Sequence, residues 1–318
     1  MYAVGIPHPG GPEVLRLVEL PTPEPGPREI RIRTTAAAVN PTDTAFRQWG
    51  PRESEGLPAP WVPGMEMAGV VDAVGPDSAW AVGERVMAIV MPRRALGGAQ
   101  AEYVVVPDNA AAAIPDGISD VEASTLPMNG LTVYSALLHL GLTAGQTLGV
   151  TGAAGAVGGY AIELGRIAGL RVVADAFAQD AELVRGLGAD VVVPASRDVA
   201  EEVAAFRAAV PDGVDGLIDA AVLDAGALPM VRDGGALTTV RFWAGPTERD
   251  IRVHPVMVRD HLTDGAEIAK LAQLVLDGRL TLRVADTYPA AEAAAAHRRL
   301  QAGGTRGRLV LTFGKDPR

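Results

Sequence analysis

Hydrophobic and polar residues alternate in several short stretches of the first 110 residues. Residues 30–34 read Ile-Arg-Ile-Arg-Thr, which is the two-residue period of a half-buried strand. Residues 69–74, 84–90 and 102–106 are further runs rich in β-branched residues, bounded by glycine, proline and aspartate. Short strands at this spacing predict a barrel-like, β-rich domain.

The pattern changes near residue 119, where Ser119 and Glu122 have the spacing of a helix capping box. From residue 147 onward, strand and helix patterns alternate, which predicts a doubly wound parallel sheet. The expected strands are 147–151, 170–174, 190–193, 216–220 and 236–240, and the helices between them are 157–168, 180–187 and 199–209. Two more helices, 266–276 and 290–301, and a final strand, 308–312, follow.

Composition narrows the class of protein. A chain of 318 residues favours two domains, and 48% hydrophobic with 21% charged residues is typical of a folded protein. The net charge of −10 argues against a nucleic-acid partner, because phosphate binding favours a basic face. The chain has no cysteine, which excludes disulfides, thiolate zinc sites and cysteine nucleophiles. Without a signal-peptide pattern or an apolar run of 18 residues, we expect a cytoplasmic protein with no membrane partner.

A glycine-rich segment, Gly152-Ala153-Ala154-Gly155-Ala156-Val157-Gly158, joins the first expected strand of the parallel sheet to its helix. Glycines let the backbone approach a pyrophosphate, and a helix N-terminus favours negative charge. The spacing differs from the commoner Gly-x-Gly-x-x-Gly, so a turn that only packs is the alternative. The expected dinucleotide contacts are Gly152, Ala154, Gly155, Ala156 and Val157.

Asp175 follows the next expected strand, 20 residues after Gly155, where a carboxylate can accept the ribose hydroxyls of a dinucleotide. A carboxylate also repels a 2′-phosphate, and no basic residue follows until Arg185. NADH is therefore favoured over NADPH. The alternative is that Asp175 only faces water.

Several motifs occur in order along nearly the whole chain: Val39-Asn40-Pro41-Thr42-Asp43, Pro63-Gly64-Met65-Glu66, Gly69-Val70-Val71, Gly83-Glu84-Arg85-Val86, the run from Leu126 to Tyr134, and the run from Thr305 to Leu311. Through them the chain resembles the medium-chain dehydrogenase/reductase superfamily, in particular its zinc-independent quinone oxidoreductase (zeta-crystallin-like) branch. The resemblance implies an α/β protein with a GroES-like β-rich catalytic domain (residues 1–118 and 254–318) and a Rossmann domain (residues 119–253).

Zinc-binding members of the superfamily carry Cys, His and Cys where this chain has Asn40, Met65 and Met128. An amide and two thioethers are poor ligands for Zn²⁺, so no metal is expected. The resemblance implies hydride transfer from NAD(P)H to a small-molecule quinone or conjugated enone, and a homodimer.

The resemblance also places Asn40, Asp43 and Thr132 at the nicotinamide cleft as catalytic candidates. Each has a plainer interpretation: Asn40 as a turn residue, Asp43 as an acceptor for backbone amides, and Thr132 as a helix cap. Further cofactor contacts are expected at Ala221, Val222, Val240 and Arg306, the last of which could instead pair with an acid. The expected substrate pocket contains Trp49, Trp61, Met65, Met128, Asn129, Phe242 and Trp243.

One departure leaves the acceptor open. Many quinone reductases of this type have a tyrosine where this chain has Ala45, and related enoyl-thioester reductases use a tyrosine in the following loop as proton donor. No tyrosine occurs between Tyr2 and Tyr103. This absence weakens the interpretation as an enoyl-thioester reductase, which stays an alternative together with a non-catalytic nucleotide-binding protein.

Overall fold

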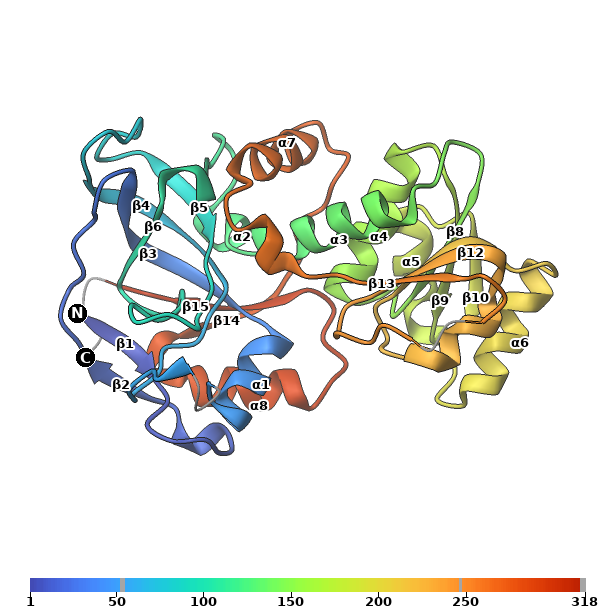
Figure 1. Ribbon diagram of the computed structural model, residues 1–318, viewed down its shortest axis with the longest axis horizontal. Coiled ribbons are helices and arrows are strands. Elements are labelled where there is room, and N and C mark those ends of the chain that lie inside the picture. The colour runs from blue at the N-terminus through green and yellow to red at the C-terminus, as the bar shows by residue number, and fades with distance from the viewer. Residues whose placement is uncertain (52–54, 246–247, 315–318) are drawn as a thin grey trace. The chain divides into compact units, whose positions relative to one another are not determined.

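The computed structural model describes residues 1–51, 55–245 and 248–314, which form two compact units (Figure 1). The first unit contains Met1–Met128, His261–Asp277 and the chain from Leu282 onward, and the second contains Asn129–Asp260 and Gly278–Thr281. The chain therefore leaves the first unit and later returns to it. The exact domain limits expected from the sequence stay a prediction.

The second unit is built on a parallel sheet of six strands in the order β10-β9-β8-β11-β12-β13. The strands are β8 (Thr147–Thr151), β9 (Arg171–Ala176), β10 (Val191–Pro194), β11 (Val214–Asp219), β12 (Val231–Thr239) and β13 (Arg252–Pro255). Its helices are most of α3 (Pro127–Leu140), and α4 (Ala156–Ile167), α5 (Ala181–Leu187) and α6 (Val199–Ala209). Counted along the chain, the strand order is 3-2-1-4-5-6, which is that of a Rossmann domain. The order reverses between β8 and β11, and ligands of such sheets bind at the carboxyl ends of the strands there.

Close packing of helix α4 on this sheet depends on a glycine. A Cβ atom on Gly165 of α4 would lie 2.7 Å from Cδ2 of Leu148 in β8. The strand itself is buried from Leu148 to Thr151. Helix α4 therefore lies against the strand that ends at the glycine-rich segment, and its first turn is held near the end of that strand.

The first unit is built on a mostly antiparallel sheet of seven strands in the order β14-β15-β3-β4-β5-β7, with β6 pairing β3. The strands are β3 (Glu29–Val39), β4 (Glu66–Val74), β5 (Arg85–Ile89), β6 (Tyr103–Pro107), β7 (Ala111–Ala113), β14 (Val284–Pro289) and β15 (Arg308–Thr312). A separate hairpin joins β1 (Tyr2–Gly5) to β2 (Arg16–Glu19), and the helices are α1 (Pro41–Trp49), α2 (Asp120–Ala123), α7 (Gly265–Leu276) and α8 (Ala293–Gln301). Strand β15 lies antiparallel to β3, so the returning C-terminal segment pairs with an early strand of the chain.

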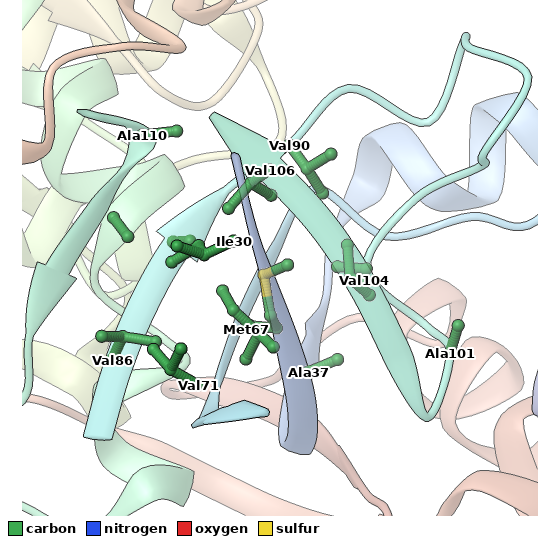
Figure 2. Close-up of a cluster of buried hydrophobic side chains, with 14 of the residues drawn as sticks. Ile30, Ala37, Met67, Val71, Val86, Val90, Ala101, Val104, Val106 and Ala110 are labelled. Carbon is green, nitrogen blue, oxygen red and sulfur yellow. The ribbon is translucent and has the colours of Figure 1, made fainter. Parts of the chain in front are cut away.

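Small aliphatic side chains fill the core of this unit. Figure 2 shows Ile30, Met67, Val86 and Val104, from β3, β4, β5 and β6, gathered in one cluster, and all of them are buried. With only 4% aromatic residues in the chain, valine, isoleucine, alanine and methionine make up this core. The alternation predicted at residues 30–34 is confirmed, because Ile30 and Ile32 are fully buried while the arginines between and after them are partly exposed.

The structure confirms the α/β class, the β-rich unit and the doubly wound unit, and it adds elements without a clear hydrophobic period. Strand β14 has no buried residue, so alternation could not reveal it. Helix α1 follows the cap Asn40 and has only three buried residues. The capping box is confirmed, since Ser119 Oγ accepts a hydrogen bond from the Glu122 amide at 3.2 Å. Among the described residues, no helix has both the length and the hydrophobicity needed to cross a bilayer.

Candidate active site

The glycine-rich segment forms a tight turn between β8 and α4. Gly152 has a φ of 63°, and its carbonyl accepts a hydrogen bond from the Gly155 amide at 2.9 Å. A Cβ atom on residue 158 would lie 2.4 Å from the carbonyl oxygen of Gly152, so this position also accepts only glycine. At Gly155 the carbonyl oxygen of Gly152, at 3.1 Å, is the one atom that a Cβ would meet within 4 Å. Two glycines therefore shape the turn, whereas Gly155 leaves a face of the loop open to close approach.

Asp175 is the main support of this turn. It lies near the end of β9 and is only 4% exposed. Its two carboxylate oxygens accept hydrogen bonds from the amides of Gly152 and Ala153, each at 2.8 Å. The side chain therefore points inward to the loop backbone, which the sequence interpretation did not foresee. The argument that Asp175 repels a 2′-phosphate loses its structural support as a result.

A second carboxyl group lies against Asp175. Glu202 of α6 is 2% exposed and interacts electrostatically with Asp175. Burial and the neighbouring charge of Asp175 raise the pKa of Glu202 to about 8, and burial also raises the pKa of Asp175. The proton resides on Glu202 because Asp175 has two backbone N–H groups that stabilise its charged form.

The carboxyl ends of β8 and β11 are joined by a hydroxyl group. Thr151 Oγ1 donates to Asp219 Oδ1 at 2.7 Å and accepts from the Ala221 amide at 3.2 Å. Asp219 also accepts from the Asp224 amide at 2.8 Å. In the chain between Ala221 and Asp224, Val222 has a φ of 63°. This backbone angle is rare for a β-branched residue and costs about 1–3 kcal/mol. Such strain concentrates at functional sites, and it falls here on a predicted cofactor contact.

A buried ion pair links the starts of strands β4 and β15 in the first unit. Arg308 at the start of β15 donates through Nη2 to Glu66 Oε1 at 2.5 Å and to Asn40 Oδ1 at 2.7 Å. Asn40 Nδ2 donates to Glu66 Oε1 at 3.1 Å, and Glu66 Oε2 accepts from the Met128 amide at 2.8 Å. These three side chains are 5% exposed or less. Both ends of the Asn40 amide are therefore bonded inside the protein, which fits a positioning role better than direct contact with a substrate.

Asp43 holds two loops of the same unit together. Its carboxylate accepts from the backbone amides of Asn40 at 2.8 Å and Gly64 at 3.0 Å, and from Gln100 Nε2 at 3.3 Å. Burial raises its pKa to about 7. Three donors are directed at the Asp43 carboxylate, and two of them are backbone amides. These contacts fit an acceptor for backbone amides better than a catalytic group.

The other candidates fall in both units. Thr132 and Asn129 are buried in α3, and the Nδ2 atom of Asn129 has no hydrogen-bond partner among the described residues. Met65 and Met128 are 4% and 8% exposed, so both side chains are buried in the protein. Trp49 and Phe242 are 71% and 70% exposed, whereas Trp243 packs against the hydrophobic core of the second unit. The remaining predicted contacts, Ala154, Ala156, Val157, Ala221, Val240 and Arg306, are partly or fully exposed.

The sequence interpretation missed Arg308, Gln100 and Glu202. Glu202 carried a signal, because it lies one helical turn before the buried Phe206 and so shares its face of α6. Arg308 is 268 residues from Asn40 along the chain, and no local pattern links them. In the described parts of the chain, no cluster of three or more His, Asp or Glu side chains has the arrangement of a metal site.

Comparisons with known proteins agree with this architecture. The family model described as alcohol dehydrogenase GroES-like domain matches residues 26–116, and the one described as zinc-binding dehydrogenase matches residues 187–311. A mycobacterial protein whose structure was solved in complex with NADPH is 30% identical with a TM-score of 0.86, and the alignment covers 98% of this chain and 100% of that one.

Two plant proteins are similar over a shorter stretch. The chloroplastic quinone-oxidoreductase homolog of Spinacia oleracea is 33% identical over 191 residues, 58% of this chain and 57% of that protein. The chloroplastic NADPH-dependent alkenal/one oxidoreductase of Arabidopsis thaliana is 31% identical over 239 residues, 73% of this chain and 60% of that protein. The chain thus spans less than two thirds of the length of these curated relatives.

The β-rich unit, the Rossmann unit and these matches define one class of protein: the chain belongs to the medium-chain dehydrogenase/reductase superfamily. Within that superfamily its homologues at about 30% identity are proteins of the quinone oxidoreductase type.

We expect Glu202→Gln to remove part of the pH dependence of stability. The folded protein raises the pKa of Glu202 from 4.5 to about 8, so between these values the native state keeps a proton that the unfolded chain has lost. Native stability therefore falls as pH rises through this window; above the window the full loss remains, and the contribution of this group no longer changes with pH. Relative to wild type, the free energy of unfolding of Glu202→Gln should rise by up to about 1.4 kcal/mol per pH unit across the window. Urea unfolding at a series of pH values measures this.

The exposed neighbour Glu201 provides the control for this experiment. Glu201→Gln makes the same change of charge one residue away, outside the contact with Asp175. A difference between Glu202→Gln and wild type that stays constant with pH would contradict the raised pKa of Glu202.

We expect Arg308→Met to destabilise the first unit by about 3–5 kcal/mol, because it leaves the charge of Glu66 buried without a partner. The double variant Glu66→Gln/Arg308→Met should regain a large part of this loss, since no buried charge remains. Chemical unfolding at neutral pH compares the variants, with the exposed Arg298→Met as control. Equal losses in the single and double variants would be the contrary result.

Proposed function

We propose that the protein is an NAD(P)H-dependent oxidoreductase that reduces a quinone or a conjugated enone without a metal ion. The observation that carries the proposal is the position of the glycine-rich turn at the carboxyl end of β8, beside the point where the order of the parallel strands reverses. Dinucleotides bind at this point in sheets of this topology.

The residues at this point fit a dinucleotide. The open face at Gly155 allows a phosphate to approach the backbone, and the N-terminus of α4 favours its negative charge. The strained Val222 lies at the end of β11, next to this turn in the sheet. When bound, a reduced nicotinamide supplies the hydride.

The acceptor class rests on the donor set and on the relatives. Asn40, Met65 and Met128 offer amide and thioether groups, which do not suit Zn²⁺. Quinones and enones need less polarisation than a simple carbonyl, because the negative charge delocalises as hydride arrives. The names of the spinach and Arabidopsis relatives refer to quinones and to alkenals or enones.

The choice between the two dinucleotides is a separate matter. Asp175 is engaged with two loop amides, so it offers no argument for NADH. The mycobacterial relative was solved with NADPH. Both dinucleotides therefore belong in the same assay.

We expect the purified protein to oxidise NADPH or NADH in the presence of quinones and enones, followed by the loss of nicotinamide absorbance. In Gly155→Val the added side chain covers the open face of the turn, and the KM for the dinucleotide should rise at least about tenfold, as expected for the loss of one charge-assisted contact. Gly186→Ala is the matched control, because a Cβ at Gly186 meets no atom within 4 Å.

Two outcomes would overturn the proposal. The first is the absence of turnover with every quinone and enone, together with no thermal shift on adding either dinucleotide. The second is faster reduction of crotonyl thioesters than of any quinone or enone, which would instead support an enoyl-thioester reductase.

A further inference from the structure

The backbone of the glycine-rich turn is held by one of two neighbouring carboxyl groups. Asp175 of β9 accepts hydrogen bonds from the amides of Gly152 and Ala153, each at 2.8 Å. Glu202 of α6 acts electrostatically on Asp175, and both side chains are buried. Strand β9 and helix α6 pack against each other within the second unit. The state of Glu202 therefore bears on the carboxylate that fixes the turn.

Ionising both of these carboxyl groups is costly, because each charge lacks solvent and repels the other. Asp175 keeps its charge, since two N–H groups donate to it. The Oε1 atom of Glu202 is buried and has no hydrogen-bond partner among the described residues, which suits a neutral acid better than a carboxylate. Burial, together with the charge of Asp175, raises the pKa of Glu202 to about 8.

The elements packed against α6 add further negative charge near Glu202. These elements are β9, β10 and the 3₁₀ helix 224–230. Strand β10 has no ionisable side chain, and the other ionisable residue of β9, Arg171, is exposed at the start of that strand. The 3₁₀ helix begins with Asp224. Asp219 at the end of β11 acts on Glu202 and disfavours its ionisation.

Two groups on the near side of α6 do not reverse this preference. Arg207 of the same helix donates to backbone carbonyl groups through Nε and Nη1, at 2.6 and 2.9 Å. The backbone of Ser196 favours ionisation of Glu202, but burial and the charge of Asp175 outweigh it. Glu202 is therefore neutral at pH 7 and gains its charge in mildly alkaline solution.

We propose that Glu202 is a positioning residue for the dinucleotide and that binding favours its neutral form, so that dinucleotide and proton bind together. The proposal rests on the proposed function. A phosphate at the open face of Gly155 and the N-terminus of α4 adds negative charge to the turn that Asp175 holds. That charge disfavours a second carboxylate beside Asp175. By linkage, dinucleotide binding takes up a proton from solvent, and the affinity falls as pH rises.

The test measures binding without turnover. The full-length protein is titrated with NADH and with NADPH by calorimetry from about pH 7.5 to 9.5, in buffers of different ionisation enthalpy. This gives both the Kd and the number of protons taken up. The phosphate groups of the ligands, with a last pKa of about 6, do not titrate in this range. We expect the Kd to rise about three- to tenfold across the range, with uptake of about half a proton near its middle.

Two variants assign this dependence to Glu202. Glu202→Gln has the shape of the neutral acid and does not ionise, so its Kd should be constant across the range and its binding should take up no proton. The exposed Glu201→Gln is the matched control and should keep the pH dependence of wild type. A purely structural role of Glu202 would instead change the Kd by the same factor at every pH. Proton uptake by wild type needs no variant, so the test holds even where Glu202→Gln folds poorly.

The failures of this proposal and of the proposed function are distinct. A wild-type Kd that is constant across the range, or binding without proton uptake, would sink this proposal and leave dinucleotide binding in place. A pH dependence that persists in Glu202→Gln would do the same. If neither dinucleotide binds at pH 7.5, the proposed function fails and this proposal fails with it.

Discussion

The buried pair of Glu66 and Arg308 connects parts of the first unit that are far apart in the chain. Arg308 lies at the start of the last strand, Glu66 at the start of β4, and Asn40 just before α1. The second oxygen of Glu66 holds the Met128 amide in the first turn of α3. A buried ion pair gains little over an apolar replacement, but loss of one partner is severe. The pair therefore acts mainly as a constraint on geometry, which fixes the four segments relative to one another within this unit.

The second unit uses a carboxylate in a similar way. Asp175 binds two amides of the glycine-rich turn, while Glu202 carries the proton that allows two carboxyl groups to lie together in the interior. Asp219 and Thr151 fix the neighbouring strand end. In both units, then, the acidic residues near the candidate site mainly organise backbone. This leaves the open face at Gly155 and the N-terminus of α4 as the parts of the turn that a ligand can approach.

The sequence predicted the order of strands and helices in the second unit because its segments have clear periods and are separated by glycine. It placed Asp175 at the correct strand end but not its orientation. Strand β9 is buried from Val172 to Ala176, so both of its faces look alike in the sequence and alternation cannot show where the carboxylate points. For Asn40 the motif indicated the place in the fold, but its partner Arg308 is 268 residues away and comes from the returning chain. Contacts of this kind depend on tertiary structure alone.

A polar residue at a position typical of the family can either hold the protein's own backbone in place or contact a ligand. Asn40 and Asp43 match such positions, yet their side chains are bonded to several groups of the protein itself, and a ligand would have to compete for them. Among the described residues, buried atoms without a partner occur both in this network, at Arg308 Nε and Gln100 Oε1, and outside it, at Asn129 Nδ2. An unmade buried hydrogen bond costs about 1–3 kcal/mol, so these atoms are a cost that the rest of the fold offsets. Asn40 and Asp43 are therefore better understood as residues that position loops and strands than as direct contacts of a ligand.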